Sequence, residues 1–379
     1  MSYSKIAMAA VVGAAVMVGS ARAETVQIGN VVELTGGGAT VGTNWKNAVE
    51  MAFKEINASG GILGKTVNLT NYDTQTNAQN SRAMVQKAMD DGAYVILGPI
   101  YSSSTKVNMI LTQRAEIPQI VGSEAPFITT TGNPYIFRTS FGAAQSMPKL
   151  AAYLKDGVKA TSVGVVWVND DFGKGGRDTV VSELKKKGIK VAVDISTEAG
   201  QADFASDVIK LKNSGADAVF AYLHEEESAR LLKEIKKQGL KQPIIGETTL
   251  MNQKVIDLAG DAANGAKGHV GLSADAPVPA VKEFAKKFEA SYGNKPDHNA
   301  IKGYIAAYTV KHVTEKMGKF DSKMFASTLH GMTITPKETP GILMEVTWDD
   351  KGDVDRQSFL VEVVNGKQEI TAILPKLGN

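Results

Sequence analysis

The sequence predicts an α/β protein with two successive parallel-sheet halves of similar size, and three observations support this fold class. Short apolar segments such as 162–168 (SVGVVWV) have the composition of strands buried on both faces of a sheet. Between them, apolar residues recur every three or four positions, as at Trp45, Ala48 and Val49, which is the pattern of an amphipathic helix. The alternation restarts after Phe141, so we expect two such units.

The first half begins with a strand over 26–34 and a glycine-rich loop at 35–38 (TGGG). The helix that follows carries an apolar stripe from Trp45 to Ile56. It ends at 57–61 (NASGG), where glycine is typical of a helix C-cap. The further elements of this half are strands over 67–72, 94–98 and 118–122 and helices over 78–89 and 103–115.

The second half repeats this order and is followed by a different ending. Its predicted elements are helices over 146–155, 174–187, 203–213 and 227–238 and strands over 162–168, 190–195, 218–223 and 243–246. Two long helical patterns follow, over 278–291 and 298–316. The chain then ends in three strand-like segments, 342–348, 358–365 and 369–374, which surround the hairpin turns 349–352 (DDKG) and 365–366 (NG).

The segment 1–23 has the features of a secretory signal peptide. Lys5 supplies a positive charge, 6–19 is apolar and uncharged, and 21–23 (ARA) is a cleavage site of the A-x-A type. The apolar run is too short to span a membrane. We therefore expect a mature protein that starts near Glu24 and is exported and soluble.

Charge and cysteine content exclude several classes of partner. The chain has 379 residues with 42 basic and 40 acidic side chains, and removal of Lys5 and Arg22 with the signal peptide lowers the basic count to 40. A neutral chain lacks the basic surplus that nucleic-acid binding requires. Because there is no cysteine, disulfides, thiolate metal sites and a lipid-carrying cysteine are excluded.

The sequence lacks the signatures of common catalytic and metal sites. It contains no GxxxxGK[ST] phosphate loop, no HExxH zinc motif and no GxSxG nucleophile elbow. The acidic stretch 349–355 (DDKGDVD) lacks the spacing and the closing Glu of a calcium loop, and is typical of a solvated turn. We therefore expect no enzyme activity, no catalytic residue, no metal and no cofactor.

Polar and aromatic residues follow several predicted strands. Ligands of open parallel sheets bind outside the carboxyl ends of the strands. The stretch 95–109 (VILGPIYSSSTKVNM) places Tyr101 and Ser102 where a strand gives way to a helix. Free N–H groups at that helix start favour an anion such as a carboxylate, although the same serines can simply cap the helix. Comparable positions are 123–125 (SEA), 170–173 (DDFG), 222–225 (YLHE) and 247–249 (ETT).

A family resemblance covers the whole chain after residue 23. The stretches that carry it are LTGGGATVG, EINASGGILGKTVNL, YDTQTN, VILGPIYSSST, IPQIVGSEA, NPYIFRTSFG, VGVVWVNDDFGKGG, DFASDVIKLKNSGADAVFAYL, LLKEIKKQGLKQPIIG and FAKKFEASYGNKPDHNA. In these motifs, in order and spacing, the chain resembles the periplasmic branched-chain amino acid-binding proteins, the type I solute-binding components of ABC importers. The resemblance implies a ligand held between two lobes by hinge closure and delivered to a membrane permease.

The resemblance also implies where the lobes and their three crossings lie. The N-lobe would comprise 24–139 and 274–346. The C-lobe would comprise 140–273 and 347–379. The crossings would lie near 139–141, 269–273 and 347–349.

The ligand-binding positions of the family fall on residues from both halves. The serine that binds the ligand carboxylate corresponds to Ser102, directly after Tyr101, and the family position that packs the ligand side chain falls on Val41. The remaining positions are Ser123, Glu124 and Ala125 in one loop, Phe172 in the D-x-[YF]-G turn, Tyr222 and His224 after a strand, and Glu247 with Thr248.

Two departures from the family pattern leave the ligand open. Ala125 stands where the family has a threonine, and Thr248 stands where it has the acidic residue that pairs with the ligand ammonium. A buried ammonium requires a carboxylate partner. If Glu124 or Glu247 faces the cleft, the resemblance implies a branched-chain or other hydrophobic amino acid; otherwise it implies a small aromatic or aliphatic carboxylate or an amide.

Three other functions remain as alternatives at this point. A secreted enzyme on this fold would need a nucleophile and base pair, and a sugar-responsive regulator would need an N-terminal helix-turn-helix. A periplasmic sensory co-receptor would bind its ligand in the same way but signal to a membrane sensor. We expect a monomeric periplasmic protein whose partners are a carboxylate-bearing small molecule and an inner-membrane ABC permease.

Overall fold

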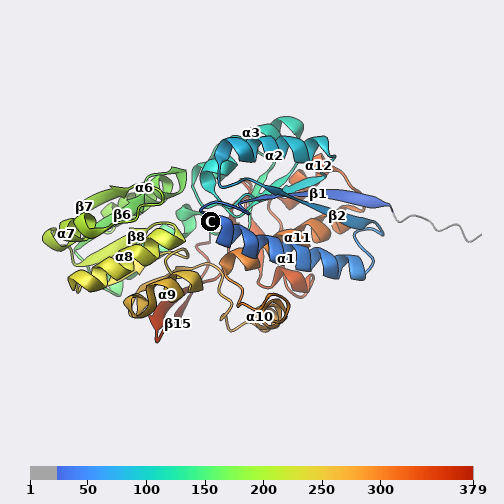
Figure 1. Cartoon of the computed structure of the whole chain (residues 1–379). Helices are drawn as coiled ribbons and strands as arrows, with labels where there is room; N and C mark the ends of the chain where they lie inside the picture. The colour runs from blue at the N-terminus through green and yellow to red at the C-terminus, as the bar shows by residue number, and fades with distance from the viewer. Residues whose placement is uncertain (1–23, 379) are drawn as a thin grey trace, which may run out of the picture.

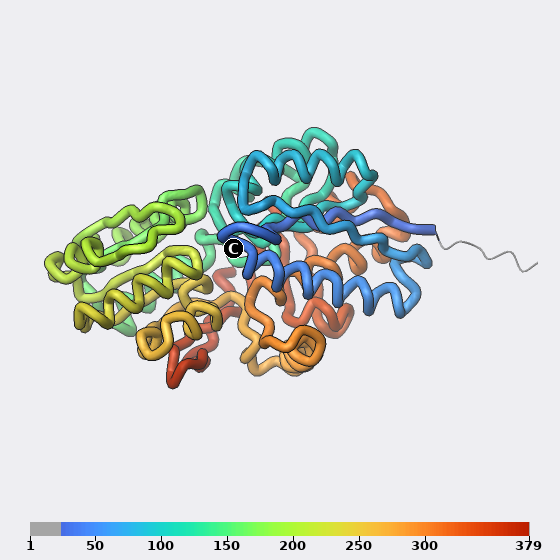
Figure 2. Tube along the Cα trace, in the orientation of Figure 1, coloured from blue at the N-terminus to red at the C-terminus, as the bar shows by residue number. Residues whose placement is uncertain are grey.

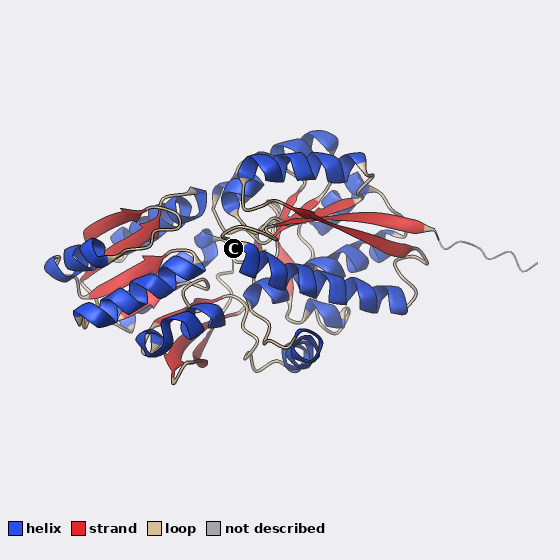
Figure 3. Cartoon of the chain, in the orientation of Figure 1, coloured by secondary structure: helices blue, strands red, loops and turns tan. Residues whose placement is uncertain are grey.

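A computed structural model describes residues 24–378, and the predicted signal peptide lies outside them. Two lobes lie side by side, each built around its own sheet (Figure 1). Helices cover the strands of both lobes (Figure 3). The predicted α/β class with two sheet-centred lobes is therefore confirmed.

The first lobe contains a five-stranded, fully parallel sheet. Its strands in spatial order are β2 (Thr66–Asp73), β1 (Thr25–Val32), β3 (Val95–Leu97), β4 (Gln119–Val121) and β5 (Ile136–Arg138). Strands β3, β4 and β5 are buried along their whole length, as their apolar sequences require. The helices of this lobe are α1 (Ala39–Ala58), α2 (Ala78–Asp90), α3 (Ser102–Ala115), α4 (Phe127–Thr130), α10 (Pro279–Tyr292), α11 (His298–Met317) and α12 (Ser322–Leu329). Helix α1 packs on α11, and α2 packs on α3.

The second lobe contains a seven-stranded sheet. Its strands in spatial order are β15 (Lys367–Leu374), β14 (Ser358–Val364), β10 (Lys267–Val270), β9 (Ile244–Gly246), β8 (Ala218–Tyr222), β6 (Ser162–Val168) and β7 (Lys190–Thr197). The order β7-β6-β8-β9-β10 repeats the order β2-β1-β3-β4-β5 of the first lobe, which is the duplication that the sequence predicts. The helices of this lobe are α5 (Ala143–Asp156), α6 (Asp171–Lys186), α7 (Ala205–Asn213), α8 (Glu225–Gln238), α9 (Gln253–Ala259) and the 3-10 turn η1 (Gly260–Ala263).

The last part of the chain visits both lobes. Figure 2 shows the orange segments around residue 300 beside the blue ones, and the red hairpin of β14 and β15 beside the yellow ones. Between these two passages the chain forms a small antiparallel sheet of β11 (Thr333–Ile334), β12 (Val346–Trp348) and β13 (Val354–Asp355), with the 3-10 turn η2 (Pro340–Ile342) between β11 and β12. This small sheet lies against β5, where the Arg138 N–H donates to the Gly352 carbonyl at 2.9 Å. The chain joins the large sheet only at Ser358, after the segment 347–349.

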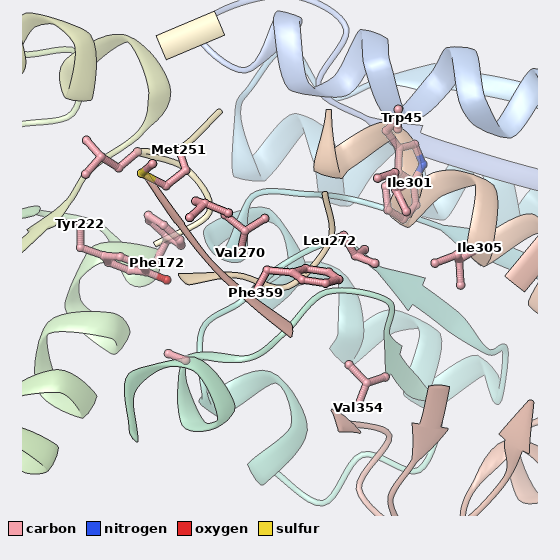
Figure 4. Close-up of a cluster of buried hydrophobic side chains, with 14 of the residues drawn as sticks. Trp45, Phe172, Tyr222, Met251, Val270, Leu272, Ile301, Ile305, Val354 and Phe359 are labelled. Atoms are coloured by element: carbon pink, nitrogen blue, oxygen red, sulfur yellow. The ribbon is translucent and has the colours of Figure 1, made fainter. Parts of the chain in front are cut away.

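The buried core is continuous across much of the molecule. Trp45 of α1 is fully buried, donates its indole N–H to Asn30 at 2.9 Å and lies beside Ile301 of α11 (Figure 4). Phe172 and Phe359 belong to the same cluster from the side of the second lobe. Within residues 24–378, no helix combines the length and the apolar character that crossing a membrane requires.

Candidate functional site

The two lobes face each other through equivalent parts of their sheets. In each sheet the strand order reverses at one point, between β1 and β3 in the first lobe and between β6 and β8 in the second. Such a switch point leaves a crevice outside the carboxyl ends of the strands, where ligands of open α/β sheets bind. Tyr101 follows β3 and His224 follows β8, and their rings stack with centroids 4.7 Å apart and planes 28° apart. The two crevices therefore meet.

A cavity of about 30 Å³ lies between the two switch points. Its wall consists of Val41, Ile100, Tyr101, Ser102, Gly122, Glu124, Phe172, His224, Glu225, Thr249, His298, Asn299 and Lys302. A second cavity of about 360 Å³ shares Val41, Tyr101, His224 and Glu225 with the first. Because the first cavity holds roughly one water molecule, an amino-acid-sized ligand enters only when these shared side chains or the lobes move apart.

The first lobe contributes the start of α3. Ser102 is its first residue and is buried, and its hydroxyl accepts the Ala125 N–H at 3.2 Å. Behind it, the carboxylate of Glu33 accepts the N–H groups of Ile100 and Tyr101 at 3.1 and 3.2 Å. Burial raises the pKa of Glu33 to about 7. The helix start is therefore organised by hydrogen bonds between the turn after β3, Glu33 after β1 and the loop after β4.

A buried ion pair forms part of the wall. The Glu124 carboxylate accepts a hydrogen bond from the Lys302 ammonium at 2.7 Å, and their side chains are only 8% and 4% exposed. Burial raises the pKa of Glu124 to about 7, although the charge of Lys302 opposes this rise. Glu124 thus faces the cavity, as one of the predicted alternatives requires, but it already has a cationic partner.

The second lobe contributes a stack of aromatic rings. Phe172 of α6 stacks on Tyr222 with centroids 4.1 Å apart (Figure 4), and on His224 with centroids 5.1 Å apart. The His224 imidazole lies 2.7 Å from an Asp170 carboxylate oxygen. Burial alone would lower the pKa of His224, but its hydrogen bond with Asp170 and the charge of that carboxylate raise the pKa to about 9. His224 is therefore a cation at neutral pH, held flat between Tyr101 and Phe172.

The glycines of 173–176 (GKGG) allow these close contacts. A Cβ at Gly176 would lie 2.1 Å from the Tyr222 ring, and a Cβ at Gly175 would lie 2.8 Å from Pro126 of the other lobe. A Cβ at Gly173 would lie 1.8 Å from the Val168 carbonyl. This glycine-rich stretch therefore packs α6 tightly against both lobes, as its position at a helix entry suggests.

The structure places the predicted site residues in two groups. Val41, Tyr101, Ser102, Glu124, Phe172 and His224 line the cavity. The other predicted residues, which lie outside its wall, are Ser123, Ala125, Tyr222, Glu247 and Thr248.

Internal contacts explain why the second group lies outside the wall. Ser123 bonds Thr105 at 2.5 Å, and its carbonyl accepts the Arg138 guanidinium at 2.8 Å. Glu247 accepts hydrogen bonds from the Thr248 N–H and hydroxyl and lies 3.0 Å from the His269 ring. Burial raises the pKa of Glu247 to about 7. Glu247 therefore faces the interior and not the cavity.

Several wall residues are not among the predicted site residues, although Glu225 and Thr249 lie in the stretches 222–225 and 247–249 that follow predicted strands. Ile100, Gly122, Glu225, Thr249, His298, Asn299 and Lys302 complete the wall. Within residues 24–378, the Thr249 hydroxyl and the Asn299 amide oxygen are buried without a hydrogen-bond partner. Buried polar atoms without a partner are costly and rare in folded proteins, so these two are groups that a polar ligand can satisfy.

Comparison with known proteins decides the family. The family model described as periplasmic binding protein matches residues 25–368. The chain belongs to this family. Its fold class and its two-lobed architecture agree with that membership.

The names of individual relatives state what those proteins bind. This chain is 27% identical over 343 residues to the leucine-, isoleucine-, valine-, threonine- and alanine-binding protein of Pseudomonas aeruginosa, and the match covers 90% of each chain. A branched-chain amino acid transporter substrate-binding protein of Streptococcus pneumoniae, solved with isoleucine, superposes with a TM-score of 0.83 at 20% identity, over 93% of this chain and 100% of that one.

A second solved structure differs in its ligand. A solute-binding protein of an ABC transporter from Rhodopseudomonas palustris, solved with 3,4-dihydroxybenzoic acid, superposes with a TM-score of 0.83 at 24% identity, over 93% of this chain and 97% of that one. At 20% and 24% identity, the two solved structures show a shared fold. The ligand of this chain must therefore be inferred from the residues that line its cavity.

Proposed function

We propose that the protein is the periplasmic solute-binding component of an ABC importer and captures a branched-chain or other hydrophobic amino acid between its lobes. The observation that supports this function best is the meeting of two strand-order switch points at one cavity. The buried start of α3 with Ser102 suits a carboxylate, because free N–H groups and the helix dipole favour an anion. Val41, Ile100 and Phe172 supply apolar surface for an aliphatic side chain.

We propose hinge closure as the working motion. The sheet memberships support an N-lobe of 24–139 and 274–346 and a C-lobe of 140–273 and the C-terminal strands. Because β12 and β13 lie against β5 and the chain joins the large sheet at Ser358, we place the third crossing at 356–357 rather than near 347–349. The segment 347–355 then belongs with the N-lobe. A closed form distinct from the open one is what a permease would recognise.

We propose export, a periplasmic location and an inner-membrane permease as partner. The signal-peptide pattern of 1–23 supports export. Membership of the periplasmic binding protein family supports the periplasm, and the relatives named above support a role in binding rather than catalysis. We expect a monomer, because capture between two lobes of one chain needs no second copy.

A small aromatic carboxylate is the second candidate ligand. Tyr101, His224 and Phe172 place three aromatic rings in the cavity wall, and an aromatic ligand ring packs favourably against such rings. An amide is a third candidate ligand for the same transport role. A sensory co-receptor would use the same site but would contact a different membrane partner.

A thermal-shift screen of the purified protein tests the function. The panel contains hydrophobic amino acids, keto acids, aromatic acids, amides and sugars. A ligand at 100 times its dissociation constant stabilises the folded state by about 2.7 kcal/mol, which raises the unfolding midpoint measurably. We expect leucine, isoleucine or valine to raise it. A rise with aromatic acids alone would support the second candidate, and no rise with any compound would contradict a solute-binding function.

A further inference from the structure

The resemblance implies that an acidic residue at the position of Thr248 pairs with the ligand ammonium, and this position carries no charge in this chain. Glu247 beside it is engaged by Thr248 and His269 and lies outside the cavity wall. Glu124 lies in the wall but is neutralised by Lys302 at 2.7 Å. An amino acid bound here therefore needs a different carboxylate for its ammonium group.

Glu225 is placed to supply that carboxylate. It is the first residue of α8, directly after His224, and only 9% of its surface is exposed. It lies in the wall of both the small cavity and the 360 Å³ cavity. Among the described residues, no side chain donates a hydrogen bond to its carboxylate, and the cations His224 and Lys302 act on it through their charge alone.

The charges of the wall leave Glu225 unbalanced. Glu124 pairs with Lys302, and His224 pairs with Asp170 at 2.7 Å, so each of these pairs is neutral as a whole. Burial and the nearby Lys302 hold the pKa of His298 well below its usual range, so His298 is uncharged. A ligand with a cationic nitrogen would balance the remaining carboxylate, whereas a plain carboxylate would add a second negative charge.

On the basis of the proposed solute-binding function, we propose that Glu225 pairs with the ligand ammonium and determines specificity for zwitterionic α-amino acids over plain carboxylates. The carboxylate of the same ligand then lies toward Ser102 at the start of α3. The two side chains line the same cavity, so an amino acid admitted when the lobes move apart can contact both. In this arrangement the ammonium partner lies at the start of α8 and not in the loop after β9, where the resemblance implies it.

Binding would also change the protonation of Glu225. Burial raises its pKa to about 7. The titratable and charged groups that face it are His224 on its own segment, Tyr101 after β3, and Asp297 and Lys302 at the start of α11. A cation placed against this carboxylate favours its ionised form, so ammonium binding near pH 7 displaces a proton from Glu225 into the buffer.

The test is calorimetric titration of the purified protein with L-leucine and with 4-methylpentanoate, the same molecule without its amino group. Glu225→Gln keeps the shape and removes the charge. The matched control is Glu226→Gln, because Glu226 is the next residue on α8 and pairs with Arg230 at the surface. We expect Glu225→Gln to weaken leucine binding at least ten-fold and to leave 4-methylpentanoate binding unchanged or tighter. Glu226→Gln should change neither affinity by more than two-fold.

The outcomes separate this inference from the proposed function. Equal leucine affinity in Glu225→Gln and wild type, or an equal loss for both ligands, overturns the role of Glu225 and leaves the binding function intact. Binding of plain carboxylates but of no amino acid by the wild type overturns both the role of Glu225 and the amino-acid ligand. Absence of binding by any ligand contradicts the function itself.

A measurement on the wild type keeps the test valid if Glu225→Gln does not fold. Titrations at pH 7 in two buffers of different ionisation enthalpy report the protons exchanged on binding. We expect leucine to release a substantial fraction of a proton and 4-methylpentanoate to release none. No difference between the two ligands would overturn the role of Glu225.

Discussion

Tyr101 of the first lobe stacks on His224 of the second with ring centroids 4.7 Å apart, and this pair lies in the shared wall of the two cavities. The contact joins the strand-order switch points of the two sheets directly. In the proposed closing motion, these two rings are therefore a contact between the lobes that also borders both cavities.

Removal of the Tyr101 ring should weaken the closed form. An aromatic pair contributes about 0.5–1.5 kcal/mol beyond its buried area, so Tyr101→Ala should lower ligand affinity roughly three- to ten-fold. Tyr101→Phe is the control, because it keeps the ring, and it should bind like the wild type. Titration calorimetry of both variants measures the effect. Unchanged affinity in Tyr101→Ala would show that the stack does not contribute to closure.

The Asp170–His224 pair should make stability depend on alkaline pH. The folded-state pKa of His224 is raised to about 9 from its ordinary 6.5, so the stabilisation by this pair is complete below pH 6.5 and is lost as the pH rises through 9. Asp170→Asn should abolish this dependence while keeping the helix cap, since asparagine also accepts the Gly173 N–H. NMR titration of the His224 ring should give a pKa near 9 in the wild type and a much lower one in the variant.

The buried Glu33 should make the folded protein less stable as the pH rises, which is the opposite of the effect of an ordinary surface carboxylate. Its folded-state pKa is raised from 4.5 to about 7, so its favourable contribution is complete below pH 4.5 and is lost as the pH rises through 7. At roughly 1.4 kcal/mol for each pKa unit, this loss amounts to about 3 kcal/mol between pH 4 and 8. Glu33→Gln should unfold with a correspondingly weaker pH dependence in urea titrations. The exposed Glu289→Gln is the control and should follow the wild-type curve; the same slope in Glu33→Gln would contradict the assignment.

Substitutions at two neighbouring glycines of α6 should distinguish an effect on folding stability from an effect on lobe closure. Gly176→Ala would place a Cβ 2.1 Å from Tyr222, inside one lobe, and should destabilise the protein by about 1–3 kcal/mol through overpacking. Gly175→Ala would place a Cβ 2.8 Å from Pro126 of the other lobe, so it should spare thermal stability but reduce ligand affinity. Thermal melts and ligand titrations of both variants check this contrast. Equal effects of the two changes on stability would show that Gly175 does not face a moving surface.

The sequence predicts apolar elements better than strands that carry a buried ionisable side chain. Strand β6 and helix α11 are long enough for their burial pattern to show in the sequence, and both were predicted within a residue or two. Strand β5 is not predicted, because it ends in a buried arginine, Arg138, whereas the equally short β3, β4 and β9 are predicted from their mainly apolar sequences. Strand β10 likewise contains a buried ionisable residue, His269. In both cases the burial of a polar residue is decided by tertiary contacts, which no local pattern contains.

Details of the tertiary structure also explain why only some of the predicted site residues line the cavity. The rule that ligands lie beyond strand ends identified Ser102, Glu124 and His224. Successive residues of extended chain point in opposite directions, so Glu124 faces the cavity while Ser123 and Ala125 face away from it. Which residue of each loop faces the ligand therefore depends on the exact end of the strand, which sequence patterns do not fix.

The cavity-wall residues of α11 do not follow a predicted strand, so the rule for strand ends does not identify them. Lys302 is a charged residue within a helix that is buried nearly all round, and this is the one sequence feature that points to it. Buried lysines are rare unless paired, so its position among apolar neighbours predicts either a partner or a ligand. Only the packing of α11 against the loop after β4 identifies Glu124 as that partner.

The most direct test of capture between the lobes is a crystal structure of the protein grown with L-leucine. We predict leucine between the lobes, with its carboxylate at Ser102 and the start of α3, its ammonium at Glu225 and its side chain against Val41 and Phe172. Leucine bound outside this cavity, or the absence of bound leucine at a concentration well above that of the protein, would contradict the account.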